Sequence, residues 1–249
     1  MEIRTIGSGK RLERCGRILS DKADISEHSL FLLPIPSTKD KITVTGTDTE
    51  LSRIPEMVNK GDTVAGYGIP EEIKKRIALC GGAVYDGALD EGLLSENAEL
   101  TARGALGYIL TEYGRDVTDL RIGIVGIGRI GSRLLHYLVM LGASPTAYTT
   151  RESLARELCE WGIDAPRDFA GAEEMDILVN TAPAKSFDEE QTARILEKTQ
   201  ILDLASGRIF PEGENVVKLP SIPEKFYPES AGEVYAKYVL KFIEEEGRE

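Results

Sequence analysis

The 249-residue chain has few cysteines and no long apolar run. Its three cysteines, Cys15, Cys80 and Cys159, are odd in number and far apart, which argues against a disulfide framework and against a zinc site. No segment approaches the ~18 consecutive apolar residues of a membrane-spanning helix, and the first residues lead into no apolar signal-peptide core. These absences predict a cytoplasmic protein with reduced thiols, no bound metal and no membrane partner.

Positive charge is also scarce. Lys and Arg number 30 against 42 Asp and Glu, which gives a formal net charge of -12. Such a chain repels a phosphate backbone instead of forming the cationic contacts that drive nucleic-acid binding. We therefore expect no nucleic-acid partner.

Short β-branched or apolar runs alternate with helical patterns along most of the chain, and this alternation predicts an α/β fold with parallel strands. In the first part we expect strands at 3–6, 29–33, 42–45, 63–67 and 83–85, with helices at 10–20 and 70–80. A second series begins with a helix at 99–113, and its expected strands are 121–125, 145–148, 177–180, 201–204 and 216–218. The intervening helices are expected at 130–141, 152–161 and 189–198, and the last helix at 230–246.

A glycine motif marks the start of the second series. Gly126, Gly128 and Gly131 follow the apolar strand and precede the next helix, which is the arrangement of a dinucleotide-binding turn. The first glycine permits the turn, the second lets the backbone approach a pyrophosphate, and the third lets the helix pack closely. Because the anion would sit on the first turn of the helix, Arg129 and Ile130 join the predicted cofactor site.

The motif and the length predict two domains, since domains commonly run ~100–150 residues. We expect an α/β substrate or partner domain at 1–95, and an NAD(P)-binding Rossmann domain, a doubly wound parallel sheet, at 96–229. The first is the smaller domain. The apolar positions of the helix at 230–249 recur at helical spacing, and this helix is expected to pack back on the first domain.

The ends of the later strands are expected to line the nicotinamide half of the cofactor site, because open α/β sheets bind ligands at the carboxyl ends of their strands. These residues are Thr181, Ala182, Pro183, Ala205 and Ser206.

The second strand of this series is followed by Thr149, Thr150 and Arg151, and no Asp or Glu occurs from Ser132 through Arg151. NAD-selective sites place an acidic residue there to bind the ribose hydroxyls, whereas two hydroxyls and a guanidinium suit a 2′-phosphate. The expected cofactor is NADP, with NAD as the alternative.

Five segments carry a resemblance to the dipicolinate synthase A-subunit family. Residues 97–105 resemble the family's segment before the cofactor domain, and 124–131 resemble its glycine loop. Residues 202–206, 219–223 and 228–232 are similar to the stretches that end and follow its Rossmann domain.

The resemblance implies an NADP-linked oxidoreductase that oxidises a cyclic dihydrodipicolinate-type dicarboxylate to dipicolinate in sporulation. It also implies that the partner is a flavoprotein-like B subunit, and we expect a homo-oligomer. Residues able to donate hydrogen bonds to carboxylates become the substrate candidates. They are Thr38, Lys39, Asn97, Thr101, Arg103 and Ser221. Arg103 replaces a family Glu and Ser221 a family Gly, so a related dehydrogenase with another substrate stays open.

Two further alternatives remain. A D-2-hydroxyacid dehydrogenase needs a late histidine as acid and base, but the chain has only His28 and His136, so this class lacks its base. The oxidation of a dihydropyridine needs less help, because aromatisation drives proton loss to water or to a weak base. No catalytic residue is assigned. A non-catalytic module that senses NADP(H) or acts as a scaffold is the other alternative.

Overall fold

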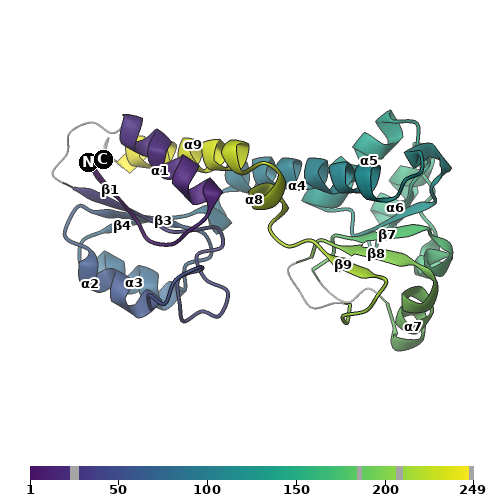
Figure 1. Cartoon of the computed structure of the whole chain (residues 1–249), viewed down its shortest axis with the longest axis horizontal. Coiled ribbons are helices and arrows are strands. Elements are labelled where there is room, and N and C mark those ends of the chain that lie inside the picture. The colour runs from purple at the N-terminus through teal and green to yellow at the C-terminus, as the bar shows by residue number, and fades with distance from the viewer. Residues whose placement is uncertain (23–27, 184–186, 206–209, 247–249) are drawn as a thin grey trace. The chain divides into compact units, whose positions relative to one another are not determined.

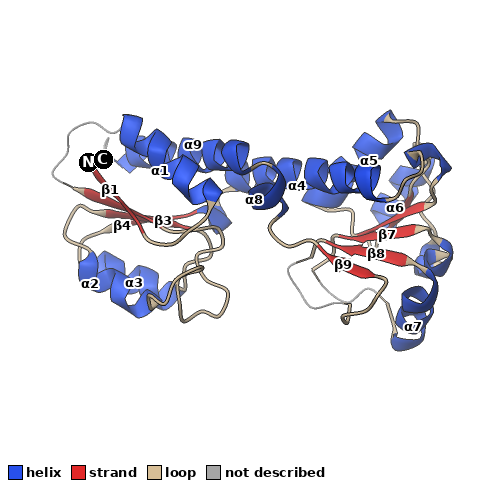
Figure 2. Cartoon of the chain, viewed as in Figure 1, coloured by secondary structure: helices blue, strands red, loops and turns tan. Residues whose placement is uncertain are grey.

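The computed structural model describes residues 1–22, 28–183, 187–205 and 210–246. The chain divides into two compact units, one formed by 1–97 with 223–249 and the other by 98–222. Both units hold a parallel sheet with helices, so the predicted α/β class with a Rossmann-type sheet is confirmed (Figure 2).

The first unit holds a four-stranded sheet in the order β1-β2-β3-β4. Its strands are β1 (Glu2–Thr5), β2 (Ser29–Leu32), β3 (Thr63–Gly66) and β4 (Ala83–Asp86), and its helices are α1 (Lys10–Lys22), α2 (Ile54–Met57), α3 (Glu71–Leu79) and α9 (Pro228–Glu246). Alternate residues of β2 enter different cores. Leu30 and Leu32 pack toward α1 and α9, whereas Phe31 packs toward α2 and α3 on the other face (Figure 1).

The second unit holds a five-stranded parallel sheet in the order β6-β5-β7-β8-β9. Its strands are β5 (Ile122–Val125), β6 (Thr146–Tyr148), β7 (Ile177–Asn180), β8 (Gln200–Asp203) and β9 (Val216–Lys218), and its helices are α5 (Arg129–Met140), α6 (Glu152–Glu160) and α7 (Glu189–Lys198). Ile177 and Val179 face the core made with α4 (Glu91–Glu112), α5 and α6, and Leu178 faces the core on the α7 side. The chain runs from β5 to one side and returns on the other, so a topological switch point lies between β5 and β7.

One predicted strand is wrong. The segment 42–45 forms no strand, and only Thr43 makes an isolated bridge to Glu50. The carboxylate of Asp40 instead accepts hydrogen bonds from the backbone of Ile42 and Thr43, each at 2.8 Å, and from the Thr43 hydroxyl. A side chain that captures the backbone groups in this way folds the segment as a turn.

Helices α4 and α9 begin two or more residues earlier than expected. Helix α4 starts at Glu91 instead of residue 99, because Asp90 accepts hydrogen bonds from the backbone N–H groups of Gly92 and Leu93 and so caps it. Helix α9 starts at Pro228 instead of residue 230, and the short α8 (Ile222–Phe226) precedes it. Among the described helices, none has the length and apolarity that a membrane crossing requires.

A buried carboxylate at the amino end of the first sheet gives a stability prediction. Asp62 is 3% exposed and accepts hydrogen bonds from the backbone N–H groups of Ser29, at 2.6 Å, and Asn59, at 2.8 Å. Asp62→Ala leaves both donors without this acceptor and is expected to lower the free energy of unfolding by about 1.5–3 kcal/mol. Urea unfolding followed by circular dichroism measures the loss, and the exposed Glu72→Ala serves as control. Equal stability of the two variants contradicts this role of Asp62.

Candidate functional site

The turn between β5 and α5 leaves no room for a side chain at its first and third glycines. Gly126 has a φ of +85°, and a Cβ there would lie 2.9 Å from the backbone nitrogen of Ala182. A Cβ on Gly131 would lie 2.1 Å from the carbonyl oxygen of Gly126, which no side chain can tolerate. Helix α5 therefore packs directly on the carboxyl ends of β5 and β7, at the switch point of the sheet.

The same turn is open at its middle glycine. A Cβ on Gly128 would meet nothing within 4 Å. Gly128 caps α5 without any side-chain hydrogen bond, and acidic residues are absent from the first turn. The first N–H groups of a helix have no intrahelical acceptor and attract an anion. Arg129 and Ile130 place their backbone in this turn, so open space lies beside Gly128 at the start of the helix.

Buried polar side chains hold the next two strand ends together. Asn180, at the end of β7, is 1% exposed, and Asp203, at the end of β8, is 3% exposed. The Asn180 amide donates to Asp203 Oδ1 at 2.8 Å, and Asp203 also accepts from the Ala205 backbone at 3.2 Å. Asn180 Oδ1 accepts from the Ala182 backbone at 3.3 Å. The pair thus fixes the start of both loops that the sequence predicts to line the nicotinamide half.

The neighbouring residues follow the same edge of the sheet. Thr181 donates its hydroxyl to the carbonyl oxygens of Val125, at 3.2 Å, and Gly126, at 2.5 Å, so it ties β7 to the glycine turn. Ala182 is half-buried and Pro183 is exposed. Ser206 lies outside the described residues.

Arg151 reaches back over the glycine turn. It precedes α6, and its guanidinium donates to the carbonyl oxygen of Ile127, while its backbone N–H donates to the Thr149 hydroxyl at 3.2 Å. Thr149 and Thr150 line a cavity of about 560 Å³ beside α6. The residues predicted to bind the adenosine side of the cofactor are therefore grouped around the end of β6.

The substrate candidates of the first unit share one loop. The Thr38 hydroxyl donates to Asp40 at 3.0 Å and accepts from the Lys41 backbone at 2.9 Å, so it organises the turn. Lys39 is exposed. The role of both residues toward a substrate stays a prediction.

The remaining candidates lie on α4 and before α8. Asn97 is half-buried, Thr101 is buried, and Ser221 is exposed with a φ of +57°.

Arg103 on α4 belongs to an ion-pair cluster. Its guanidinium lies 2.9 Å from Glu99 and donates to the Tyr137 hydroxyl at 3.1 Å. The hydrogen bond from Tyr137, with Arg103 and Arg133 nearby, holds the pKa of Glu99 below its usual value. The charge of Arg103 is therefore matched locally, and its part in substrate binding stays a prediction.

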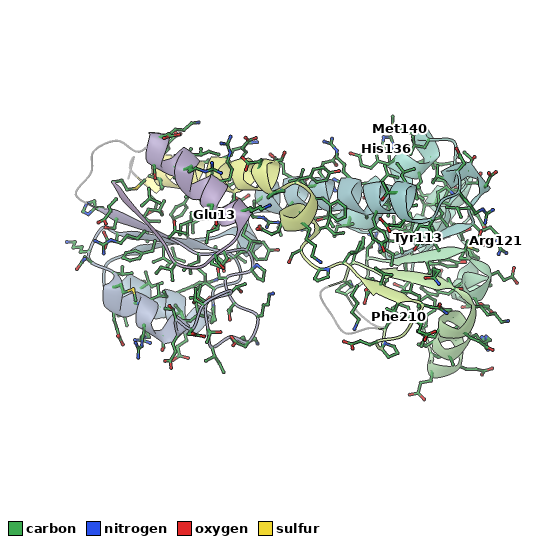
Figure 3. All side chains as sticks on the ribbon, in the orientation of Figure 1. Glu13, Tyr113, Arg121, His136, Met140 and Phe210 are labelled. Atoms are coloured by element: carbon green, nitrogen blue, oxygen red, sulfur yellow. The ribbon has the colours of Figure 1, made fainter. Side chains whose placement is uncertain are left out.

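His136 does not face the strand ends that form this site. His136 is exposed, and Figure 3 shows it with Met140 on the outer side of α5, away from the sheet. In the described part of the chain, no three His, Cys, Asp or Glu side chains are grouped to hold a metal ion.

Comparison with known proteins gives relatives in sequence and in structure. No family model matches the chain. It is 23% identical to the A subunit of dipicolinate synthase from Bacillus subtilis (strain 168) over 161 residues, which cover 60% of this chain and 54% of the relative. The sequence match thus spans about half the length of that protein.

Solved structures extend the likeness over both units. The same subunit in a crystal structure from Bacillus subtilis has a TM-score of 0.80 at 16% identity, covering 100% of this chain and 98% of that one. Its counterpart from Bacillus halodurans has a TM-score of 0.76 at 17% identity, with 97% of each chain covered. A Polaromonas protein described as a putative NAD-binding D-isomer specific 2-hydroxyacid dehydrogenase reaches 0.59 at 14% identity, over 99% and 96% of the chains.

These likenesses confirm the resemblance drawn from the sequence: the chain is similar to the A subunit of dipicolinate synthase and has the same α/β fold with a Rossmann-type sheet.

Proposed function

We propose that the protein is an NAD(P)-dependent oxidoreductase. The observation that carries the proposal is the glycine turn, which is packed tight at Gly126 and Gly131 and open at Gly128. This combination closes a helix onto a sheet and leaves the backbone accessible to a pyrophosphate. The relatives, which include dehydrogenases by name, support the assignment.

Each part of the site has a role toward the cofactor. The first turn of α5 would hold the pyrophosphate, and the loops that Asn180 and Asp203 fix would orient the nicotinamide half. The bound nicotinamide supplies the hydride acceptor, whereas the protein supplies position and charge.

NADP is the proposed form of the cofactor. Arg151 has one N–H engaged with Ile127, and a guanidinium carries five donors in a fork that matches phosphate oxygens. Thr149 and Thr150 add hydroxyls two and one residues before Arg151, and both line a cavity of about 560 Å³ together with Glu152 and Arg156 of α6. Glu152, the first acidic residue after the strand, belongs to the first turn of α6, where its charge suits the helix dipole.

The proposed substrate is a dihydrodipicolinate-type cyclic dicarboxylate. It would lose a hydride to the oxidised cofactor and a proton to water, which leaves the aromatic dipicolinate. The likeness to one component of dipicolinate synthase supports this substrate and, as partner, a flavoprotein-like B subunit. This oxidation needs no strong base from the protein, because the proton goes to water. The exposed position of His136 agrees with this.

Turnover is the direct test. The protein, by itself and with a candidate B subunit, is expected to reduce NADP⁺ when dihydrodipicolinate is supplied, with dipicolinate formed in equal amount. NADPH absorbance and chromatography of the product follow the two halves of the reaction. A protein that binds NADPH tightly but turns over no dihydrodipicolinate under either condition overturns the proposed substrate, and a dehydrogenase with another substrate or a sensor then remains.

Gly128→Asp is expected to abolish dinucleotide binding without unfolding the protein. The new side chain finds open space, but it places bulk and negative charge where the pyrophosphate would lie. Gly107→Asp is the matched control, because a Cβ on Gly107 in α4 also meets nothing within 4 Å. Calorimetric titration with NADPH compares the two folded variants. Undiminished binding by Gly128→Asp would show that the turn is only structural.

Arg151→Ala is expected to remove the preference for NADPH over NADH. A charge-assisted hydrogen bond contributes about 1.5–3 kcal/mol, so NADPH affinity should fall about ten- to a hundredfold while NADH affinity changes little. Dissociation constants for both nucleotides measure the ratio. Arg121→Ala is the control, since Arg121 pairs with Asp176 at the amino end of β5. A ratio that stays the same in Arg151→Ala rules out the phosphate contact.

A further inference from the structure

The first unit contains a buried guanidinium that the proposed function has not used. Arg11 lies in the first turn of α1, directly after the turn Gly7-Ser8-Gly9 that leaves β1. Its side chain is 5% exposed, and its Nε has no hydrogen-bond partner among the described residues. Burial lowers the pKa of Arg11 from its usual value, against the opposing effect of Glu224. A buried guanidinium nitrogen without a hydrogen-bond partner calls for an explanation.

A carboxylate of the chain lies at this place. Glu224, on α8, has its Oε2 3.5 Å from Arg11 Nε and its Oε1 3.3 Å from the Arg11 backbone nitrogen. Gly9 has a φ of +133°, and a Cβ there would lie 2.9 Å from Glu224 Oε1. The glycine is thus what admits an anion to the first turn of α1.

Both contacts of Glu224 are long. Hydrogen bonds between a guanidinium and a carboxylate are ordinarily ~2.7–2.9 Å and are often bidentate. The Glu224 side chain is 30% exposed, whereas the Arg11 side chain is 5% exposed and therefore buried. Glu224 can therefore return to water at small cost, but Arg11 cannot leave.

The position in the fold also suits a ligand. The turn after β1 lies at the carboxyl ends of the parallel strands, the edge where open α/β sheets bind their ligands. Tyr67, just past the end of β3, and Tyr235 on α9 are the other titratable groups that act on Arg11. Burial raises the pKa of Tyr235 well above its usual value, so this hydroxyl does not compete as an anion.

We propose that Arg11 and the first turn of α1 form a carboxylate-binding site, and that Glu224 fills this site until a carboxylate of the substrate replaces it. The inference deepens the proposed function, because it rests on a dicarboxylate substrate and adds Arg11 to the residues that would bind it. A free carboxylate can approach Arg11 Nε and the helix N–H groups at ordinary hydrogen-bond distances, which the tethered Glu224 does not reach.

Two substitutions with opposite expected effects test the proposal. In NADPH-saturated full-length protein, Glu224→Gln is expected to bind dipicolinate about tenfold more tightly than wild type, because the resident anion is gone. Arg11→Met is expected to bind it about ten- to a hundredfold more weakly. Arg14→Met is the matched control on the same helix, since Arg14 pairs with the exposed Glu233. Calorimetry gives the affinities, and thermal unfolding without ligand shows that each variant is folded.

The outcomes separate this site from the proposed function. If the Arg11–Glu224 pair is only structural, Glu224→Gln binds no more tightly than wild type, and the proposal is overturned while NADPH binding stands. Glutarate, an acyclic dicarboxylate, provides a second probe. If glutarate binds more tightly to Glu224→Gln and dipicolinate does not, the anion site is supported and the dipicolinate substrate fails. Should Arg11→Met not fold, Arg11→Lys keeps the charge without the fork, and Glu224→Gln by itself still decides.

Discussion

The close approach of Gly131 to the carbonyl oxygen of Gly126 is the constraint on which the second unit depends. The space between them is too small for a single Cβ, which would lie 2.1 Å from that oxygen. Helix α5 can therefore sit directly on the ends of β5 and β7, where Thr181 hydrogen-bonds the turn from the other strand. The proposed pyrophosphate contact follows from this packing, because it aims the unfilled N–H groups of α5 at the switch point.

The elements of the second unit are predictable because each one carries a local signal. Strands β7 and β9 have the bounds that their apolar runs predict, and the turn after β5 has its three glycines. The predictions are wrong where one side chain decides the local structure. Asp40 turns the segment 42–45 away from a strand, and Asp90 starts α4 at Glu91, well before the expected residue 99. Capping aspartates leave only a weak mark in hydrophobic periodicity.

In the candidate sites, too, the sequence predicts contacts between residues that are near in the chain and misses contacts between residues that are far apart. The glycine turn and Arg151 stand within one βαβ unit and can be found from spacing. The Asn180–Asp203 bond joins residues 23 positions apart, and Arg11 meets Glu224 across 213 positions. No sequence spacing predicts such pairs, because the sheet order and the return of the chain at α8 bring them together. In the sequence, Arg11 is one more charge in a helix rich in them.

The two units share one local arrangement at a helix N-terminus, which a carboxylate of the chain fills in the first unit and which is open in the second. In each, a strand ends in a glycine turn that opens onto the first turn of a helix: β1 to α1 in the first, and β5 to α5 in the second. The N-terminal turn of α5 has no side-chain cap and open space at Gly128, as a site for an outside anion requires. That of α1 holds the carboxylate of Glu224 beside a buried guanidinium. In a chain with a net charge of -12, anionic ligands bind only where such local positive fields outweigh the overall repulsion. An internal carboxylate at α1 compensates the buried charge of Arg11 when no ligand is present, and its long contacts keep that compensation weak enough to exchange.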